Sequence, residues 1–131
     1  MVPDDRYRIR AEVSRWIADP AVQVMISSGG TGLTGRDGTP EAVAPLLDKT
    51  MDGFGELFRM LSFETIGTSS LQSRCLAGVA NGTLIFVLPG SLDAVSTAWD
   101  RLIRAQLDAE TLPCNLVQLM PRLREDPDQL A

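Results

Sequence analysis

A glycine-rich loop between a strand-like segment and a helix start constrains the fold of this chain more than any other feature. Residues 21–27 form a short apolar run without strict alternation, which predicts a largely buried strand. Residues 28–38 follow, with five glycines in eleven positions. Thr39-Pro40-Glu41 then predicts a helix with Thr39 as its N-cap that runs to about Leu47. The chain must therefore pass from strand to helix through a loop in which nearly half of the residues have no side chain.

Helical and strand patterns alternate along the rest of the chain. A first helix is expected from Asp4 or Asp5 to Asp19-Pro20, with apolar residues at Ile9, Val13, Trp16 and Ile17. A second helix is expected between Gly53 and Gly67, with Phe54, Leu57, Phe58 and Leu61 on its apolar face. Asn81-Gly82 predicts a hairpin between runs 76–80 and 83–88, and a further helix is expected from Ser91 to about Leu107. This alternation predicts a layered α/β domain.

A second loop, Leu88-Pro89-Gly90-Ser91, also leaves a predicted strand and enters a predicted helix. If the two strands are parallel neighbours, both loops lie at the carboxyl end of one sheet, where open α/β sheets bind their ligands. Their backbone N–H groups would then converge on one crevice that suits phosphate groups. The loops together predict a site for a phosphorylated ligand.

The glycine loop also comes close to two familiar nucleotide motifs. Residues 30–35 match G-x-G-x-x-G, but Gly38 and Pro40 would break the helix that this dinucleotide fingerprint requires. With Arg36-Asp37 the same residues approach the P-loop, yet the lysine and the Mg²⁺-binding hydroxyl of that motif are replaced. We reject both motifs. A flexible surface loop is the remaining structural alternative.

The composition excludes several classes of function. The length of 131 residues fits one domain, and the formal charge of −5 argues against a nucleic-acid-binding surface. With no histidine, and with Cys75 and Cys114 lacking metal-type spacing, a zinc site and Ser-His or Cys-His catalytic pairs are excluded. No apolar run approaches the roughly 20 residues of a membrane span, and no secretory signal opens the chain. We therefore expect a cytoplasmic protein without membrane or nucleic-acid partners.

Asp37 allows two interpretations. A carboxylate beside phosphate-binding N–H groups is repulsive unless a cation lies between them, so one interpretation is a Mg²⁺ ligand that bridges to phosphate oxygens. The other is a structural contact to the N–H groups near Thr39. Asp4 and Asp5 are likewise either helix caps or ligands, and capping is the more common role for an aspartate before a helix.

Several motifs in a fixed order give the chain a resemblance to a known family. They are Val2-Pro3-Asp4, Ser28-Gly29-Gly30-Thr31-Gly32, Gly35-Arg36-Asp37-Gly38-Thr39-Pro40-Glu41, Gly53-Phe54-Gly55-Glu56, Ser73-Arg74, Ala77-Gly78 and Leu88-Pro89-Gly90-Ser91. In this order and spacing the chain resembles the MoaB/MogA family, whose domain also forms the G domain of gephyrin. The resemblance implies an α/β three-layer sandwich with a mostly parallel central sheet and a β-hairpin, with the family's first strand-helix-strand missing here. It places a molybdopterin-binding domain at residues 1–120 and a polar C-terminal tail at residues 121–131.

The resemblance also implies an activity in molybdenum cofactor biosynthesis. It suggests a molybdopterin adenylyltransferase-like enzyme that transfers AMP from Mg-ATP to the terminal phosphate of molybdopterin, with Mg²⁺ as cofactor and ATP and molybdopterin as substrates. Asp37 and Asp4 are then the catalytic acidic pair, and Asp37 is the metal ligand. The implied cofactor-binding residues are Gly29, Gly30, Thr31, Gly32, Pro89, Gly90 and Ser91.

Two further expectations follow from the resemblance. Family members assemble as homotrimers or hexamers, so we expect a homo-oligomer. Because an N-terminal segment of the family is missing, the alternative function is a non-catalytic molybdopterin-binding or oligomer-assembly module. The resemblance assigns no chemical role to Glu56, Ser73 or Arg74.

Overall fold

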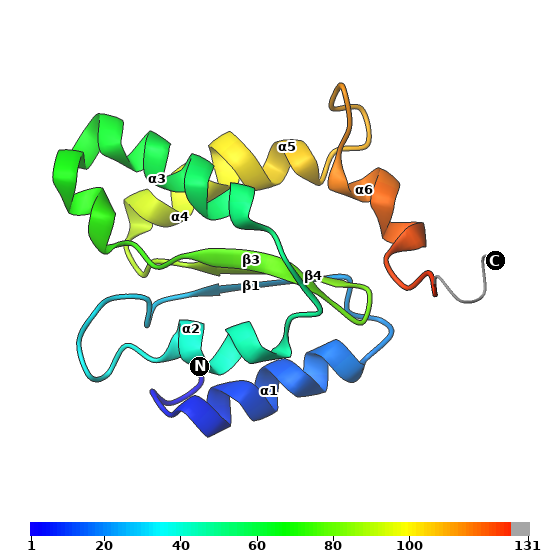
Figure 1. Cartoon of the computed structure of the whole chain (residues 1–131), viewed down its shortest axis with the longest axis horizontal. Coiled ribbons are helices and arrows are strands. Elements are labelled where there is room, and N and C mark those ends of the chain that lie inside the picture. Colours follow the sequence, from blue (N-terminus) through cyan, green and yellow to red (C-terminus); the bar gives the residue numbers. More distant parts are fainter. Residues whose placement is uncertain (127–131) are drawn as a thin grey trace.

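The computed structural model describes residues 1–126 and contains one sheet with helices on both faces. The helical elements are α1 (Arg6–Ala18), α2 (Thr39–Val43), α3 (Asp52–Ile66), α4 (Leu92–Ala98), α5 (Arg104–Gln106) and α6 (Leu116–Leu119), together with the short 3₁₀ segments η1 (Ala44–Leu46), η2 (Gly67–Gln72) and η4 (Met120–Arg122) and the π-helical segment η3 (Trp99–Ile103). Helices α1 and α2 cover one face of the sheet, and α3, α4 and α5 cover the other (Figure 1). The predicted three-layer α/β architecture is therefore confirmed.

The sheet has four strands in the order β1-β4-β3-β2. Their bounds are β1 (Val24–Ser28), β2 (Lys49–Thr50), β3 (Leu76–Ala80) and β4 (Thr83–Leu88). Strand β1 pairs with β4 in parallel, whereas β4 with β3 and β3 with β2 are antiparallel. Within residues 1–126 the sheet is thus mixed rather than mostly parallel. The reason is the hairpin, because a two-residue turn can join only antiparallel strands, and β2 then extends the antiparallel edge.

The predicted hairpin turn is confirmed at Asn81-Gly82. Both residues have positive φ, 48° for Asn81 and 82° for Gly82, as the preferred two-residue hairpin turn requires. The Asn81 backbone N–H donates to the carboxylate of Asp48 at 2.8 Å, and its side-chain amide donates to the Ile17 carbonyl at 2.9 Å. The turn is therefore connected to the residue before β2 and to the end of α1.

Helix α1 follows its sequence signals closely. The Asp5 carboxylate accepts hydrogen bonds from the N–H groups of Tyr7 and Arg8, both at 2.9 Å, so Asp5 rather than Asp4 is the N-cap. The helix ends at Ala18, with Asp19 as C-cap before Pro20, as predicted.

Helix α2 departs from its prediction in two ways. Gly38 is the N-cap, so Thr39 is the first helical residue and lies buried instead of capping. The α-helix ends at Val43 and continues only as the 3₁₀ segment that contains Pro45, because proline removes an N–H donor that the α-helix needs.

Other boundaries were less visible in the sequence. The first strand begins at Val24, later than the predicted residues 21–27. The predicted helix after Ser91 is present but contains a π-helical turn, running through α4, η3 and α5 to a C-cap at Leu107. Strand β2 and the C-terminal segments α6 and η4 had no counterpart among the predicted elements.

Two clusters of buried side chains form the core, one on each face of the sheet. The cluster beneath α3 and α4 contains Phe54, Phe58, Cys75, Ala77, Leu84, Phe86, Leu88, Ala98 and Ile103, and the cluster beneath α1 and α2 contains Val13, Met25, Val43, Ala80, Ile85 and Val87. Alternate residues of β4 enter the two clusters, as the two-residue period of a strand dictates. All six residues of β4 are buried, so this strand is the centre of the domain.

The described part of the C-terminal segment packs on the domain. Leu123 lies against the core cluster beneath α3, and the Arg124 Nε–H donates to the Asn81 carbonyl at 2.9 Å. Residues 127–131 of the predicted tail lie outside the described residues, and the domain boundary at residue 120 stays a prediction. Among the described helices, none has the length and apolar character to span a membrane.

Candidate functional site

The two loops identified in the sequence leave the same end of the sheet. In the parallel pair of β1 and β4, Ser28 lies beside Leu88, so both strands end at the same level. The Gly29 N–H donates to the Leu88 carbonyl at 2.9 Å and extends the pairing by one residue. The prediction that the two strands are parallel neighbours, with their loops at one carboxyl edge, is therefore confirmed.

A crevice of about 430 Å³ opens where these loops meet. Its lining comes from the glycine loop, the loop after β4, α3 and the η2 segment, and consists of Gly29, Gly30, Thr31, Gly32, Asp37, Phe58, Ser62, Ile66, Ser69, Gln72, Ser73, Pro89, Gly90, Ser91 and Ala94. All seven residues predicted to bind the cofactor are among them, together with Asp37. The crevice thus combines backbone groups and hydroxyls with an apolar wall, which is how small-molecule sites are commonly built.

Close backbone packing explains why glycines line this crevice. Gly29 and Gly30 have φ values of 101° and 70°, in the left-handed region that other residues rarely adopt. A β-carbon on Gly30 would overlap the hydroxyl of Thr39, and one on Gly90 would lie 3.2 Å from the Gly29 α-carbon. The two loops therefore approach each other through their backbones at Gly29 and Gly90.

Asp37 lines the crevice and also organises the loop. Its Oδ2 atom accepts hydrogen bonds from the Thr34 hydroxyl at 2.7 Å and from the Thr34 backbone N–H at 3.0 Å. These bonds, the hydroxyl contribution first, lower the pKa of the Asp37 carboxyl below its ordinary value. A β-carbon on Gly32 would lie 2.6 Å from Oδ2, so the carboxylate also packs against the loop backbone. The structural partner of Asp37 is thus Thr34 rather than the N–H groups near Thr39.

The structure does not bring Asp4 to the crevice. Asp4 lies just before α1 and pairs with Arg36, with 3.4 Å between its Oδ2 and the Arg36 Nη2, and both side chains are exposed. Arg36 is the sequence neighbour of Asp37. Asp4 therefore contacts the same loop as Asp37, but the two carboxylates do not share a site. Among the described residues, no group of three or more histidine, cysteine, aspartate or glutamate side chains could hold a metal ion by itself.

Ser91 acts in the structure as the cap of α4. Its hydroxyl accepts a hydrogen bond from the Ala94 N–H at 3.1 Å, which satisfies one donor of the first turn. Ala94 lines the crevice, so the beginning of this helix faces the space between the loops. The partial positive charge of a helix N-terminus favours an anion there.

Arg74 is the residue whose role the sequence did not reveal. It lies just before β3, yet its guanidinium donates to the carbonyls of Gly32 (2.9 Å) and Asp37 (3.0 Å) in the glycine loop. The same group donates to both oxygens of the Glu41 carboxylate, at 2.9 and 2.7 Å. In the sequence, the family motif Ser73-Arg74 was the one signal at this position, and it assigned Arg74 no role. Ser73 lines the crevice, whereas Glu56 lies at a different hollow beside α3.

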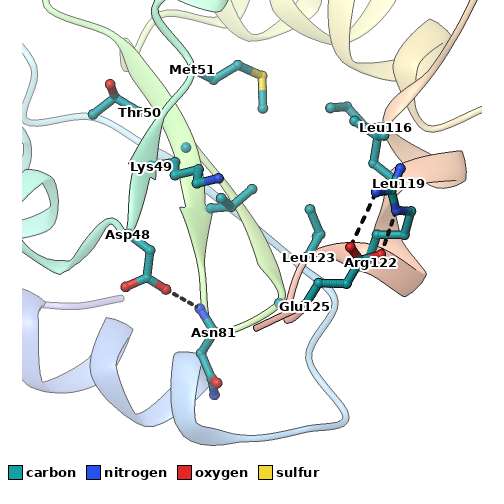
Figure 2. Close-up of a pocket in the computed structure, with 13 residues that line it drawn as sticks. Asp48, Lys49, Thr50, Met51, Asn81, Leu116, Leu119, Arg122, Leu123 and Glu125 are labelled. Atoms are coloured by element: carbon teal, nitrogen blue, oxygen red, sulfur yellow. Dashed lines mark hydrogen bonds and ion pairs between the residues drawn. The ribbon is translucent and has the colours of Figure 1, made fainter. Parts of the chain in front are cut away.

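A second and larger hollow of about 670 Å³ lies between β2 and the C-terminal segment (Figure 2). In Figure 2, Lys49 extends from β2 across β3 into the hollow. Dashed lines mark the lining pairs Arg122–Glu125 and Asp48–Asn81. Much of its wall is apolar, from Met51, Leu116, Leu119 and Leu123. We place the functional site in the smaller crevice, because two strand ends, a helix start and a loop carboxylate meet there.

Comparison with known proteins gives a consistent result. Residues 1–109 match the family model described as "Probable molybdopterin binding domain". The chain is 62% identical over 115 residues to a protein of Escherichia coli (strain K12) named molybdenum cofactor biosynthesis protein B, covering 88% of this chain and 68% of that one.

Solved structures agree with the sequence matches. A crystal structure of a molybdenum cofactor biosynthesis protein B superposes with a TM-score of 0.77 at 44% identity, covering 81% of this chain and 66% of the other. The tungsten cofactor synthesizing protein MoaB from Pyrococcus furiosus gives a TM-score of 0.76 at 33% identity, covering 94% and 72%. The chain thus spans about two thirds of the length of these relatives.

Proposed function

Because the chain belongs to the molybdopterin-binding domain family of molybdenum cofactor biosynthesis proteins, we propose that it transfers AMP from Mg-ATP to the terminal phosphate of molybdopterin. In this reaction a phosphate oxygen of molybdopterin attacks the α-phosphorus of ATP, and the bond to the departing pyrophosphate breaks. The observation that carries the proposal is the crevice at the joined ends of β1 and β4, where two backbone-lined loops and an ionised Asp37 meet.

The composition of the crevice suits a phosphorylated ligand with a flat apolar part. Loop N–H groups and the beginning of α4 favour phosphate oxygens, while Phe58 and Ile66 offer an apolar wall. Transfer of a phosphoryl or nucleotidyl group depends mainly on positioning and charge neutralisation. The chain therefore needs no histidine for this reaction.

Asp37 is the residue that would hold Mg²⁺. Magnesium in nucleotide-handling proteins is bound by one or two carboxylates together with substrate phosphates, and a single lining carboxylate fits that mode. The hydrogen bonds from Thr34 lower the pKa of Asp37, so they favour the ionised carboxylate that a metal ligand requires. When bound, Mg²⁺ supplies positive charge to the reacting phosphates. Asp4 pairs with Arg36 and does not line the crevice, so we assign the larger effect to Asp37.

The direct test is to incubate the protein with molybdopterin and Mg-ATP and to measure adenylylated pterin and pyrophosphate. We expect equal amounts of both products from the natural chain, and a loss of product with Asp37→Asn. Asp100→Asn, an exposed carboxylate on η3, is the matched control and should keep the activity. Absence of adenylylated pterin from the folded protein would reject the proposal.

A non-catalytic molybdopterin-binding or oligomer-assembly module is the second candidate. It is favoured by the crevice lining, in which Asp37 is the one carboxylate among the described residues, since Asp4 pairs with Arg36 outside the crevice. On this alternative, calorimetry should detect molybdopterin binding that is independent of ATP and unchanged in Asp37→Asn. Loss of product in Asp37→Asn, from a protein that shows turnover, would reject the alternative.

We also propose that the chain acts in the cytoplasm as a homotrimer or hexamer. Support comes from α3, on which Leu57, Met60 and Phe63 are each about half exposed. Neighbouring side chains three residues apart on a helix can form an exposed apolar patch, and such a patch marks a protein contact. Light scattering should report an oligomer for the natural chain and a smaller species for Phe63→Glu. A monomer at micromolar concentration would contradict the proposal.

A further inference from the structure

Arg74 joins the segment before β3 to the glycine loop and the first turn of α2, which lie 33 to 42 residues earlier in the sequence. Its Nε and Nη2 atoms reach the carbonyls of Gly32 and Asp37, which lie 42 and 37 residues earlier, and its Nη1 reaches the Glu41 carboxylate. The two carbonyls bracket the loop segment 32–37 at its two ends. A single planar guanidinium therefore fixes the separation of both ends of this segment.

These contacts also affect the charge that a ligand meets. Gly32 and Asp37 both line the crevice, and carbonyl oxygens facing a phosphate would repel it. Both oxygens are instead occupied by hydrogen bonds to Arg74. The guanidinium uses its N–H donors on the loop carbonyls and on Glu41, and Arg74 does not line the crevice. It therefore supports the loop without a contact to the ligand.

Glu41 connects this arrangement to the helices beneath the sheet. It lies in the first turn of α2, and its backbone carbonyl accepts from Arg10 of α1 at 2.9 Å. The Arg10 Nε–H donates to the next carbonyl, that of Ala42, at 3.0 Å. Arg74 lowers the pKa of the Glu41 carboxyl, first through its hydrogen bond, because the contact stabilises the ionised carboxylate. The glycine loop is thus connected through Arg74 and Glu41 to α2 and α1.

We propose that Arg74 is a positioning residue, which holds the glycine loop and Asp37 in the geometry that receives Mg²⁺ and the phosphate, without touching either. The assignment to a reaction rests on the adenylyltransferase function proposed above, whereas the holding of the loop does not. Lysine cannot replace Arg74, because one ammonium group cannot donate to two carbonyls and a carboxylate in a fixed plane.

The first experiment needs no substrate. Amide hydrogen exchange of Arg74→Lys, measured without ligand, should show residues 30–38 exchanging about tenfold faster, the change expected when a charge-assisted hydrogen bond to the loop is lost. The amides of β3 and β4 should exchange as in the natural chain. Arg124→Lys is the matched control, since Arg124 also donates from Nε to a carbonyl but at the far hairpin. Unchanged exchange of residues 30–38 in Arg74→Lys would overturn the proposal, whether or not the chain proves to be an enzyme.

The second experiment separates positioning from direct catalysis. In Arg74→Lys we expect the Mg²⁺ concentration for half-maximal rate to rise about tenfold, with kcat at saturating Mg²⁺ largely recovered. Glu41→Gln, which leaves the two carbonyl contacts of Arg74 in place, should give a smaller rise in the same direction. A fall in kcat with no change in Mg²⁺ dependence would indicate direct contact with the reacting groups and overturn the proposal. A loss of thermal stability in Arg74→Lys with unchanged Mg²⁺ dependence would also overturn the proposal, because the role of Arg74 would then be purely structural.

Discussion

Alanine substitutions at three glycines of the loop separate backbone strain from steric overlap. Gly29 has a φ of 101°, but a β-carbon there meets no described atom within 4 Å. Gly30 has a φ of 70°, and its β-carbon would overlap the buried Thr39 side chain. Gly35 lies in the same loop with neither a positive φ nor a described neighbour within 4 Å of a β-carbon. The three positions therefore differ in which penalty alanine meets.

The expected magnitudes follow from these differences. Alanine in the left-handed region costs about 1–2 kcal/mol, which is the expected loss in the free energy of unfolding for Gly29→Ala. Gly30→Ala adds an overlap in a packed region, which brings the expected loss to about 2–5 kcal/mol. Gly35→Ala should change stability by less than about 1 kcal/mol, in the stabilising direction, because alanine restricts the unfolded chain.

Urea denaturation followed by tryptophan fluorescence measures these differences, and thermal unfolding should show a Tm shift of about 4 °C per kcal/mol for a domain of this size. Molybdopterin affinity measured on the same variants should fall in the same order. Equal losses for Gly29→Ala and Gly30→Ala would refute the overlap with Thr39. A loss for Gly35→Ala as large as that for Gly30→Ala would refute the whole reasoning.

Three further predictions concern the core, the ion pair and the cysteines. Phe86 is fully buried against the Phe54 ring. Phe86→Ala should therefore lower the free energy of unfolding, measured in urea, by about 3–5 kcal/mol. A loss below about 1 kcal/mol would contradict the assignment of Phe86 to the core. Because the folded pKa of Glu41 is lowered, its contribution is present above its unfolded pKa and is lost as pH falls through the folded value. Glu41→Gln should thus be less stable than the natural chain at pH 7, and this gap in stability should narrow as the solution is acidified below the ordinary glutamate pKa. A gap that does not change with acidification would contradict this. A thiol reagent should label the exposed Cys114 in the folded protein. Cys75 is buried and its pKa is raised by burial, so it should react only after unfolding. Rapid labelling of both cysteines in the folded protein would contradict the burial of Cys75.

Local chemistry made part of this fold predictable. Asn81-Gly82 adopts the positive φ values that only a few residues tolerate, so the hairpin could be placed from two residues. Asp5 capped α1 as one of the two candidates, because capping depends on neighbours in the sequence. The meeting of both loops required one further assumption, that β1 and β4 are parallel neighbours, and the register of Ser28 with Leu88 confirmed it.

Features that depend on distant residues were not predictable in the same way. Strand β2 consists of Lys49 and Thr50, which are exposed and become a strand only by pairing with β3. Arg74 reaches a loop about forty residues away, and no local pattern marks such a contact. Asp4 was expected to form a catalytic pair with Asp37, but it lies outside the crevice and pairs with Arg36, and sequence order gives no information on that contact.

The most direct test of the central claim is an NMR titration of the protein with molybdopterin, which reports which backbone amides respond. The account predicts that the largest shift changes occur at residues 29–32 and 90–94, where the two loops and the beginning of α4 form the crevice. Small changes are expected around Lys49 and Leu119, which line the larger hollow between β2 and α6. Shift changes centred on that hollow, with the glycine loop unaffected, would contradict the account.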